Sequence, residues 1–292
     1  MFAGSLVAIV TPMRPDGSLD LEAWSQLLEW HIASGTQGVV VGGTTGESAT
    51  LSEAELGELT QRACALARGR MAVIAGAGTS STAGTVARVR WLSELPIDGL
   101  LLVTPAYNRP SQEGLYQHFA AAAAAASRPL LLYNVPSRTA VDMQPATVAR
   151  LARLPRIVGL KEAVPEVARV RELTRSCPPG FVVLSGDDAT AREVILAGAR
   201  GVISVTANVA PAAMSEMVAA ALAGEGERAQ ALDAPLAALH RDLFLEANPI
   251  PVKWLLARMG RIPAGIRLPL TPLGESYRAG VLAAARSGGL LG

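Results

Sequence analysis

The chain has 292 residues, of which 50% are hydrophobic and 17% are charged, and its formal net charge is +1. This composition is that of a globular protein with a sizeable core, and it excludes a disordered chain. Because Lys and Arg form no cluster, the sequence offers no electrostatic footprint for nucleic acid or for an anionic membrane. We therefore expect small-molecule substrates, no nucleic acid partner and no membrane partner.

The first ten residues, MFAGSLVAIV, lack the charged region and the cleavage pattern of a signal peptide, and no window approaches the ~20 apolar residues of a membrane span. Cys64 and Cys177 stand in no redox or metal-binding spacing, and the three histidines fit no zinc pattern. We expect a cytoplasmic protein with reduced thiols, no bound metal and no cofactor.

Eight short apolar runs follow one another along the chain, each ending in turn residues and leading into a segment of helical character. Each run is continuously apolar rather than alternating, which is typical of a parallel strand buried on both faces. The runs are SLVAIVTP (5–12), GVVVGGTT (38–45), MAVIAGAG (71–78), DGLLLVTP (98–105), PLLLYNVP (129–136), RIVGLKEA (156–163), FVVLSGDD (181–188) and GVISVTAN (201–208).

The helical segments carry recognisable end signals. Ser52 with Glu55 three residues later predicts a capping box at the start of a helix that stops at Gly69. Near the C-terminus, NPIPVKWLLARMG and TPLGESYRAGVLAAARSG each begin with a capping residue, Asn248 and Thr271, followed by proline.

Eight strand–helix units in about 225 residues indicate an α/β protein, a (β/α)8 TIM barrel. A doubly wound sheet is the alternative, but GAGTSS after the third run lacks the third glycine of a dinucleotide-binding loop. We expect the barrel and its active site in residues 1–224. Residues 225–292 are expected to form a C-terminal helical appendage packed on the barrel.

In such barrels the active site lies at the carboxyl ends of the strands, where this chain has an unusual residue, Lys161. Only two lysines, Lys161 and Lys253, stand among the 26 basic residues. Burial disfavours the charged form of an amine, and a neutral amine attacks carbonyl groups to form a Schiff base, which arginine cannot do. The sequence therefore favours a nucleophilic role for Lys161, against the alternative of an ion pair at the barrel rim, and a structural or supporting role for Lys253.

Strand periodicity predicts which neighbours accompany this lysine. If Lys161 points into the barrel, so do Gly159 and Ile157, while Val158 and Leu160 face the helices. Glu162 then points away from Lys161. An inward tyrosine on the preceding strand, Tyr133, lies within reach of the amine.

The motifs GGTTGESATL, TPAYNRPSQEGLYQHF, LLYNVPSRT, GLKEA, LSGDDA, GVISVTANV and NPIPVKW together closely resemble the dihydrodipicolinate synthase family, within the pyruvate-dependent class I aldolases of the N-acetylneuraminate lyase superfamily. The resemblance extends from Phe2 to the C-terminal helices. It implies condensation of pyruvate with L-aspartate 4-semialdehyde to 4-hydroxy-tetrahydrodipicolinate, the first committed step of the diaminopimelate and lysine pathway.

The resemblance also implies a role for each matching residue. Lys161 forms the Schiff base, Tyr133 donates and accepts protons, and Thr44 and Tyr107 complete the relay, with Tyr107 coming from the neighbouring subunit of a dimer of dimers. The residues implied to contact the substrates are Thr45 for the pyruvate carboxylate, Arg138 for the semialdehyde carboxylate, and Gly186 and Ile203 as pocket lining.

The same resemblance bears on regulation. In lysine-sensitive relatives the effector binds at the dimer interface through polar groups. The matching positions here are Ser48, Ala49, Glu53, Leu56, Ser80, Gly84 and Ala106. The chain keeps Ser48 and Ala49, but Leu56, Gly84 and Ala106 offer no side-chain donor or acceptor, so we expect little or no feedback inhibition by lysine.

Three other functions remain open from the sequence. A related aldolase acting on N-acetylneuraminate or a 2-keto-3-deoxy sugar acid would share Lys161 and Tyr133 but would not need Arg138. A non-catalytic barrel that only binds a keto acid would not need the lysine, the tyrosine and Thr44 together. A phosphosugar isomerase is disfavoured because GDDATA and TANVAP provide no glycine-rich phosphate site.

Overall fold

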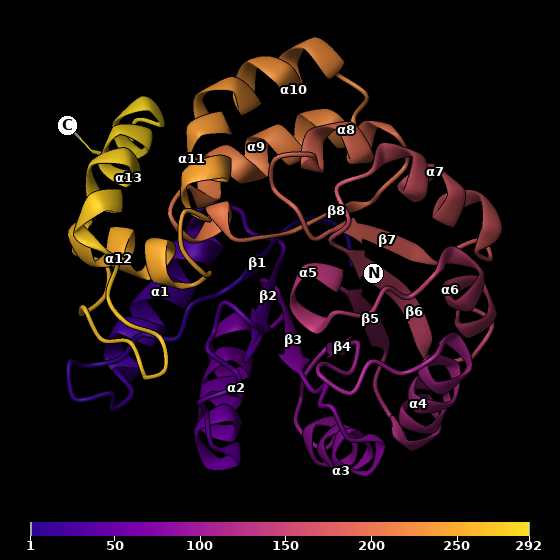
Figure 1. Cartoon of the computed structure of the whole chain (residues 1–292). Coiled ribbons are helices and arrows are strands. Elements are labelled where there is room, and N and C mark those ends of the chain that lie inside the picture. The colour runs from indigo at the N-terminus through magenta and orange to yellow at the C-terminus, as the bar shows by residue number, and fades with distance from the viewer. Residues whose placement is uncertain (1, 292) are drawn as a thin grey trace.

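The computed structural model describes residues 2–291, and within them eight parallel strands close into a barrel in sequence order, β1 to β8. The expected TIM barrel is confirmed, and Figure 1 shows the strands at the centre with helices around them. The strands are β1 (Gly4–Ala8), β2 (Gly38–Val41), β3 (Ala72–Gly76), β4 (Gly99–Val103), β5 (Leu130–Asn134), β6 (Ile157–Glu162), β7 (Val182–Ser185) and β8 (Gly201–Ser204).

Helices alternate with these strands. The helices of the barrel are α1 (Leu21–Ala33), α2 (Glu53–Ala67), α3 (Thr82–Ser93), α4 (Gln112–Ala125), α5 (Pro136–Thr139), α6 (Pro145–Leu151), α7 (Val167–Ser176), α8 (Ala191–Leu196), η1 (Thr206–Asn208) and α9 (Pro211–Leu222). The capping box of α2 is confirmed: Ser52 Oγ accepts a hydrogen bond from Glu55 N–H, and the Glu55 carboxylate accepts one from Ser52 N–H.

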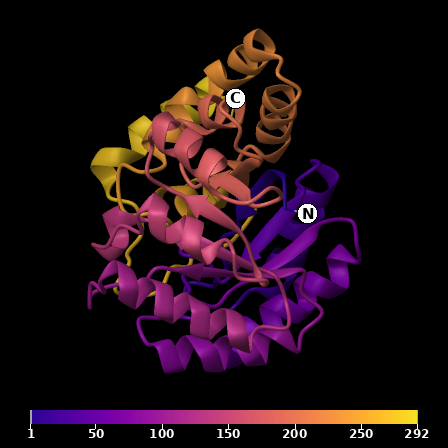
Figure 2. The ribbon, with the colours of Figure 1, turned by 90° about the vertical axis from the view of Figure 1, so that its right-hand side faces the viewer.

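After α9 the chain continues as further helices. These are α10 (Gly226–Asp233), η2 (Ala234–Leu236), α11 (Ala237–Asp242), α12 (Ile250–Arg258) and α13 (Glu275–Ser287). α10 packs on α9 and α8, and α13 packs on α11 and α12. In Figure 2 these orange and yellow helices lie in the upper part of the view.

The two expected C-terminal helices are present, but their predicted starts are wrong. Pro249 is the N-cap of α12 and Gly274 that of α13, so neither Asn248 nor Thr271 caps its helix. The side-chain amide of Asn248 instead donates a hydrogen bond into the site described below. A tertiary contact has thus replaced the local capping bond that the sequence pattern suggested.

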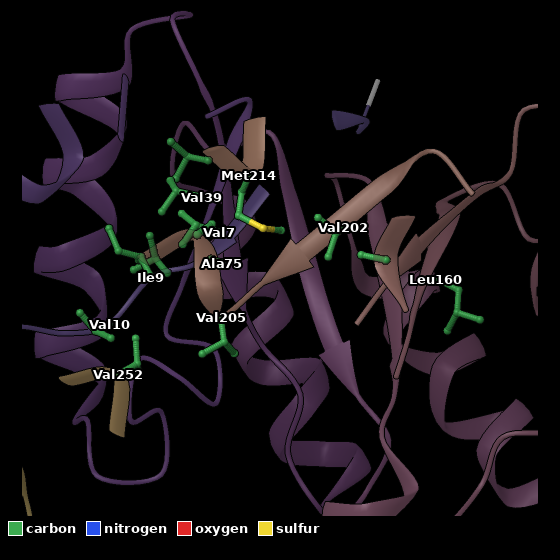
Figure 3. Packing of buried hydrophobic residues seen from close by; sticks show 14 of the residues in the cluster. Val7, Ile9, Val10, Val39, Ala75, Leu160, Val202, Val205, Met214 and Val252 are labelled. Atoms are coloured by element: carbon green, nitrogen blue, oxygen red, sulfur yellow. The ribbon is translucent and has the colours of Figure 1, made fainter. Parts of the chain in front are cut away.

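The buried apolar side chains form two clusters. The larger one lies between strands and helices, and Figure 3 shows part of it, including Val7, Val39 and Leu160. The smaller one fills the barrel interior with side chains such as Leu6, Ile74 and Ile203. Parallel strands covered on both faces explain why the eight runs in the sequence are continuously apolar.

On β6, the predicted alternation of side chains between the barrel interior and the helices is right at the carboxyl end of the strand and wrong at its start. Leu160 joins the outer cluster as expected, but Ile157 also faces the helices, while Val158 packs against the inner cluster. The cause is an irregularity in the pairing with β5, where Leu130 pairs with Ile157 but Leu131 pairs with Gly159. Such a bulge inserts a residue and inverts the alternation before it.

No helix within residues 2–291 has both the length and the apolar character that crossing a membrane requires. Over the same residues, no group of three or more His, Cys, Asp or Glu side chains is arranged to hold a metal ion.

Candidate active site

A cavity of about 430 Å³ opens at the carboxyl ends of the strands. Each of the eight strands contributes to it, either with a residue near its carboxyl end or with one just beyond. The lining comprises Ala8, Val40, Gly42, Gly43, Thr44, Thr45, Ser48, Gly76, Ala77, Gly78, Arg88, Leu101, Val103, Tyr133, Val135, Ser137, Arg138, Lys161, Ala163, Gly186, Asp187, Val205, Phe244, Ala247 and Asn248.

Lys161 lies in this cavity, 5% exposed, at the end of β6. Tyr133 is its register partner on β5, and the Lys161 Nζ lies 4.3 Å from the centroid of the Tyr133 ring. No group in residues 2–291 forms a hydrogen bond or ion pair with this Nζ. An amine held in an enclosed cavity without a protein partner is available to attack a carbonyl carbon.

The glycine at the end of β7 is explained by this lysine. A Cβ added to Gly186 would lie 3.0 Å from Lys161 Cε and 2.9 Å from Ala163 Cβ. Contacts that short require the neighbours to move, so a larger residue here would displace the lysine side chain. Gly186 thus leaves the space that Lys161 occupies.

The loop after β2 presents Thr44 and Thr45 to the cavity. Consecutive turn bonds fold it tightly, with Gly46 N–H and Ser48 N–H both donating to the Gly43 carbonyl. Thr45 is buried, and its Oγ1 accepts a hydrogen bond of 2.9 Å from Asn248 Nδ2.

This loop is anchored by a buried ion pair between Glu47 and Lys253 of α12. The second oxygen of Glu47 accepts a hydrogen bond from Arg267 N–H at 3.1 Å. Burial lowers the pKa of Lys253, although the Glu47 carboxylate opposes the effect. Breaking a buried pair leaves an uncompensated charge, so the pair rigidly joins the Thr44–Thr45 loop to the C-terminal segment.

Arg138 lies on the short helix α5 directly after β5 and lines the same cavity. Its Nη2 donates a hydrogen bond of 3.2 Å to the backbone carbonyl of Asn248. Asn248 therefore contacts Thr45 through its side chain and Arg138 through its backbone. Its Oδ1 is buried without a hydrogen-bond partner in the described part of the chain.

Glu162, next to the lysine, points away from it, as expected. Its carboxylate accepts hydrogen bonds from Arg169 Nε (2.9 Å) and Asn134 Nδ2 (3.0 Å). Burial raises the pKa of Glu162, with the Arg169 guanidinium acting in the opposite direction. This cluster outside the cavity braces the ends of β5 and β6.

Two of the site residues expected from the sequence lie outside the cavity lining of this single chain. Tyr107 is 95% exposed and its backbone has a φ of 73°, an uncommon conformation for a bulky residue. Ile203 is buried inside the barrel among the inner apolar cluster. The other six, Thr44, Thr45, Tyr133, Arg138, Lys161 and Gly186, line one cavity.

Two features of the site are not visible in the sequence: Asn248 as a site residue and Glu47 as the partner of Lys253. Both contacts join positions more than 200 residues apart, and no local pattern encodes such pairings. The signal that was available is an asparagine in front of two prolines, in NPIP, together with a second lysine in a chain that otherwise uses arginine.

The chain is similar to known proteins over its whole length. The Dihydrodipicolinate synthetase family matches residues 1–287. A protein from Azoarcus sp. (strain BH72) named 4-hydroxy-tetrahydrodipicolinate synthase is 53% identical over 290 residues, covering 99% of each chain. One of the same name from Alcanivorax borkumensis is 53% identical over 291 residues, covering 100% of this chain and 99% of its own.

Among solved structures, the chloride-inhibited dihydrodipicolinate synthase from Acinetobacter baumannii, complexed with pyruvate, superposes with a TM-score of 0.98 at 48% identity, over the full length of both chains. This match covers both the barrel and the C-terminal helices. The chain therefore belongs to the dihydrodipicolinate synthetase family and is an enzyme, a lyase of that family.

Proposed function

We propose that this enzyme condenses pyruvate with L-aspartate 4-semialdehyde to give 4-hydroxy-tetrahydrodipicolinate, the first committed step of the diaminopimelate and lysine pathway, in the cytoplasm. The observation that carries the proposal is the amine of Lys161, enclosed, without a protein partner and 4.3 Å from the Tyr133 ring centroid. The names of the relatives and the pyruvate in the Acinetobacter baumannii structure support the choice of substrates.

The first half-reaction takes place on pyruvate. The Lys161 amine attacks the ketone carbon, the resulting carbinolamine loses water, and a Schiff base forms. Loss of a proton from the methyl group then gives the enamine. Thr45, held by Asn248, holds the pyruvate carboxylate at the end of the turn formed by the loop after β2.

The second half-reaction uses the semialdehyde. The enamine carbon attacks its aldehyde and forms the new carbon–carbon bond. The amine of the former semialdehyde then attacks the imine carbon, which closes the ring and releases the Lys161 amine. Arg138 pairs with the semialdehyde carboxylate as a fork-shaped donor.

Each of these steps moves a proton, and Tyr133 is the group that moves it. Its ring packs against Lys161, so its hydroxyl lies in the same cavity as the reacting carbon. Thr44 and Tyr107 of the neighbouring subunit pass the proton on to solvent. A hydroxyl relay of this kind acts as a general acid and base.

The decisive assay mixes the purified enzyme with pyruvate and L-aspartate 4-semialdehyde and couples product formation to the reductase that consumes it. We expect turnover with this pair and none with N-acetylneuraminate or a 2-keto-3-deoxy sugar acid. Cleavage of either sugar acid, with no condensation, would identify the enzyme as the related aldolase. Binding of a keto acid without either reaction would indicate that the protein binds its ligand without catalysing a reaction.

Arg138→Ala separates the two half-reactions. Arg138 lies on α5, whereas Lys161 ends β6, so the variant should still form the borohydride-trappable pyruvate adduct. Its KM for the semialdehyde should rise by roughly 10- to 100-fold, the cost of losing a charge-assisted pair. Steady-state kinetics in both substrates give the result, and equal damage to adduct formation would contradict this assignment.

We also propose that the active unit is a dimer, assembled in pairs into a tetramer. A 95% exposed tyrosine with a left-handed backbone, absent from its own cavity, fits a residue that completes the site of a neighbour. We expect light scattering to show a dimer or tetramer and Tyr107→Phe to lower kcat. A fully active monomer would refute the shared site.

Feedback inhibition by L-lysine should be weak or absent. Leu56, Gly84 and Ala106 carry no side-chain donor or acceptor where sensitive relatives have polar groups. Burying the charged ends of an amino acid without partners costs several kcal/mol, more than the ~1–3 kcal/mol typical of allosteric coupling. Inhibition curves at limiting and saturating pyruvate test this expectation, and strong inhibition at sub-millimolar lysine would contradict it.

A further inference from the structure

His240 on α11 uses both nitrogens of its buried ring. Its Nδ1 lies 2.9 Å from Thr206 Oγ1, and its Nε2 lies 3.2 Å from Asp233 Oδ1. His31 and His118 are buried as well, but each leaves its Nε2 without a hydrogen-bond partner among residues 2–291. The ring of His240 is therefore held from both sides, which fixes its orientation.

The two contacts of this ring lead to different parts of the molecule. Asp233 ends α10, so the contact at Nε2 stays within the C-terminal helices, where Asp233 also accepts a hydrogen bond from Arg192 of the outer helix α8. Thr206 begins η1, which follows β8. The contact at Nδ1 therefore joins α11 to the carboxyl ends of the strands.

A buried carboxylate joins the start of η1 to the loop after β7. The Oδ2 atom of Asp188 accepts hydrogen bonds of 2.9 Å from both Val205 N–H and Thr206 N–H. Its Oδ1 has no hydrogen-bond partner in the described part of the chain. Because a buried carboxylate is costly without such donors, the two backbone bonds tie the loops after β7 and β8 together.

The charges around His240 favour its protonated form. Burial alone would lower its pKa, but the hydrogen bond to Asp233 and the nearby carboxylates of Asp188 and Asp187 raise the pKa overall. The protonated ring donates from both nitrogens, to the Thr206 hydroxyl and to Asp233. In the neutral ring, the Thr206 hydroxyl donates to Nδ1 while Nε2–H still donates to Asp233, so both contacts persist in either charge state.

The two loops that this network joins line the active-site cavity. Gly186 and Asp187 after β7 and Val205 after β8 belong to the lining. Gly186 leaves the space that Lys161 occupies, since a Cβ there would lie 3.0 Å from Lys161 Cε. A displacement of the loop after β7 therefore changes the surface against which the lysine side chain packs.

We propose that His240 is a positioning residue for Lys161. Its contact with Thr206 holds the start of η1, and Asp188 carries this restraint to the loop after β7, beside the lysine. Neither His240 nor Thr206 is among the described residues that line the cavity, so they act through the loop and not on the substrate. The inference rests on the proposed role of Lys161 as the Schiff-base amine.

The test measures how fast the pyruvate adduct forms. The full-length enzyme is mixed rapidly with pyruvate and quenched with borohydride at increasing times, and the mass of the intact chain gives the fraction of adduct. Thr206→Val removes the hydroxyl, and Thr206→Ser keeps it. His240→Gln keeps a polar group near the Nε2 position, towards Asp233, whereas His240→Asn keeps one at the Nδ1 position, towards Thr206.

The matched control is a second buried histidine–threonine pair. His31 Nδ1 lies 3.0 Å from Thr36 Oγ1. Thr36 precedes β2, at the amino ends of the strands, whereas the cavity opens at their carboxyl ends. Thr36→Val should lower the thermal stability as Thr206→Val does, but leave the rate of adduct formation unchanged. The comparison separates the loss of a buried hydrogen bond from the loss of positioning.

We expect Thr206→Val and His240→Gln to slow adduct formation at saturating pyruvate by about tenfold, because a small misplacement of a reacting group is costly. Thr206→Ser and His240→Asn should retain most of the rate. The pyruvate concentration that gives the half-maximal rate should stay within about twofold of the wild-type value. The Thr44–Thr45 loop is anchored separately, through Glu47 and Lys253.

An unchanged rate in Thr206→Val would overturn the inference, as would equal slowing in His240→Asn and His240→Gln or in Thr36→Val. The final extent of adduct formation reports the folded fraction of each variant, so partial unfolding lowers the extent and not the rate. A wild-type enzyme that forms no adduct at all would contradict the proposed Schiff base, and the inference with it. Slowing in the variants cannot be mistaken for that result, because their wild-type reference forms the adduct.

Discussion

Lys161→Arg should abolish condensation, with turnover reduced by at least about 10³-fold, because arginine keeps the positive charge but cannot form a Schiff base. Charge alone therefore does not rescue the function, and the coupled assay gives the result.

The covalent step has its own measurement. Pyruvate and borohydride should add one pyruvate-derived mass to each wild-type chain and none to Lys161→Arg, with peptide mapping placing the label at Lys161. The only other lysine, Lys253, is occupied in its pair with Glu47. A label at Lys253 would show that the wrong amine has been assigned.

Tyr133→Phe should leave the fold intact and lower kcat by roughly 10²–10⁴-fold, the usual contribution of a general acid or base. The ring contact with Lys161 survives in phenylalanine, so only the hydroxyl is lost. Tyr116→Phe is the control, because that tyrosine lies on α4, outside the cavity lining, with Arg150 over its ring. Unchanged turnover in Tyr133→Phe would move the proton transfer to another group.

The barrel could be predicted because each strand is marked by a local pattern, a short run of apolar residues. Every one of the eight apolar runs became a strand, since continuous burial on both faces leaves the same mark along each run. The start of β6 was not predictable. A one-residue irregularity opposite Leu130 and Leu131 turns Ile157 outward, and it arises from pairing with a strand about 27 residues earlier in the chain.

The position of the lysine was likewise visible in sequence, because a charged residue ending an apolar run stands out against its surroundings. The contacts around it were not. The sequence pattern indicated that Asn248 caps a helix, but its side chain donates a hydrogen bond to Thr45. Lys253 lies on the expected helix, and its ion pair with Glu47 was not foreseen. Both depend on how α12 docks against a loop at the other end of the chain, which no sequence window contains.

The Glu47–Lys253 pair and the Asn248–Thr45 bond span 206 and 203 residues. A ribosome releases the chain from its N-terminus, so all eight strands emerge before either contact can form. A nascent chain that has already closed its barrel therefore still lacks the groups that fix the Thr44–Thr45 loop. Lys161 is added just past the middle of synthesis, but the Thr44–Thr45 loop is fixed only when the last fifth of the chain has left the ribosome.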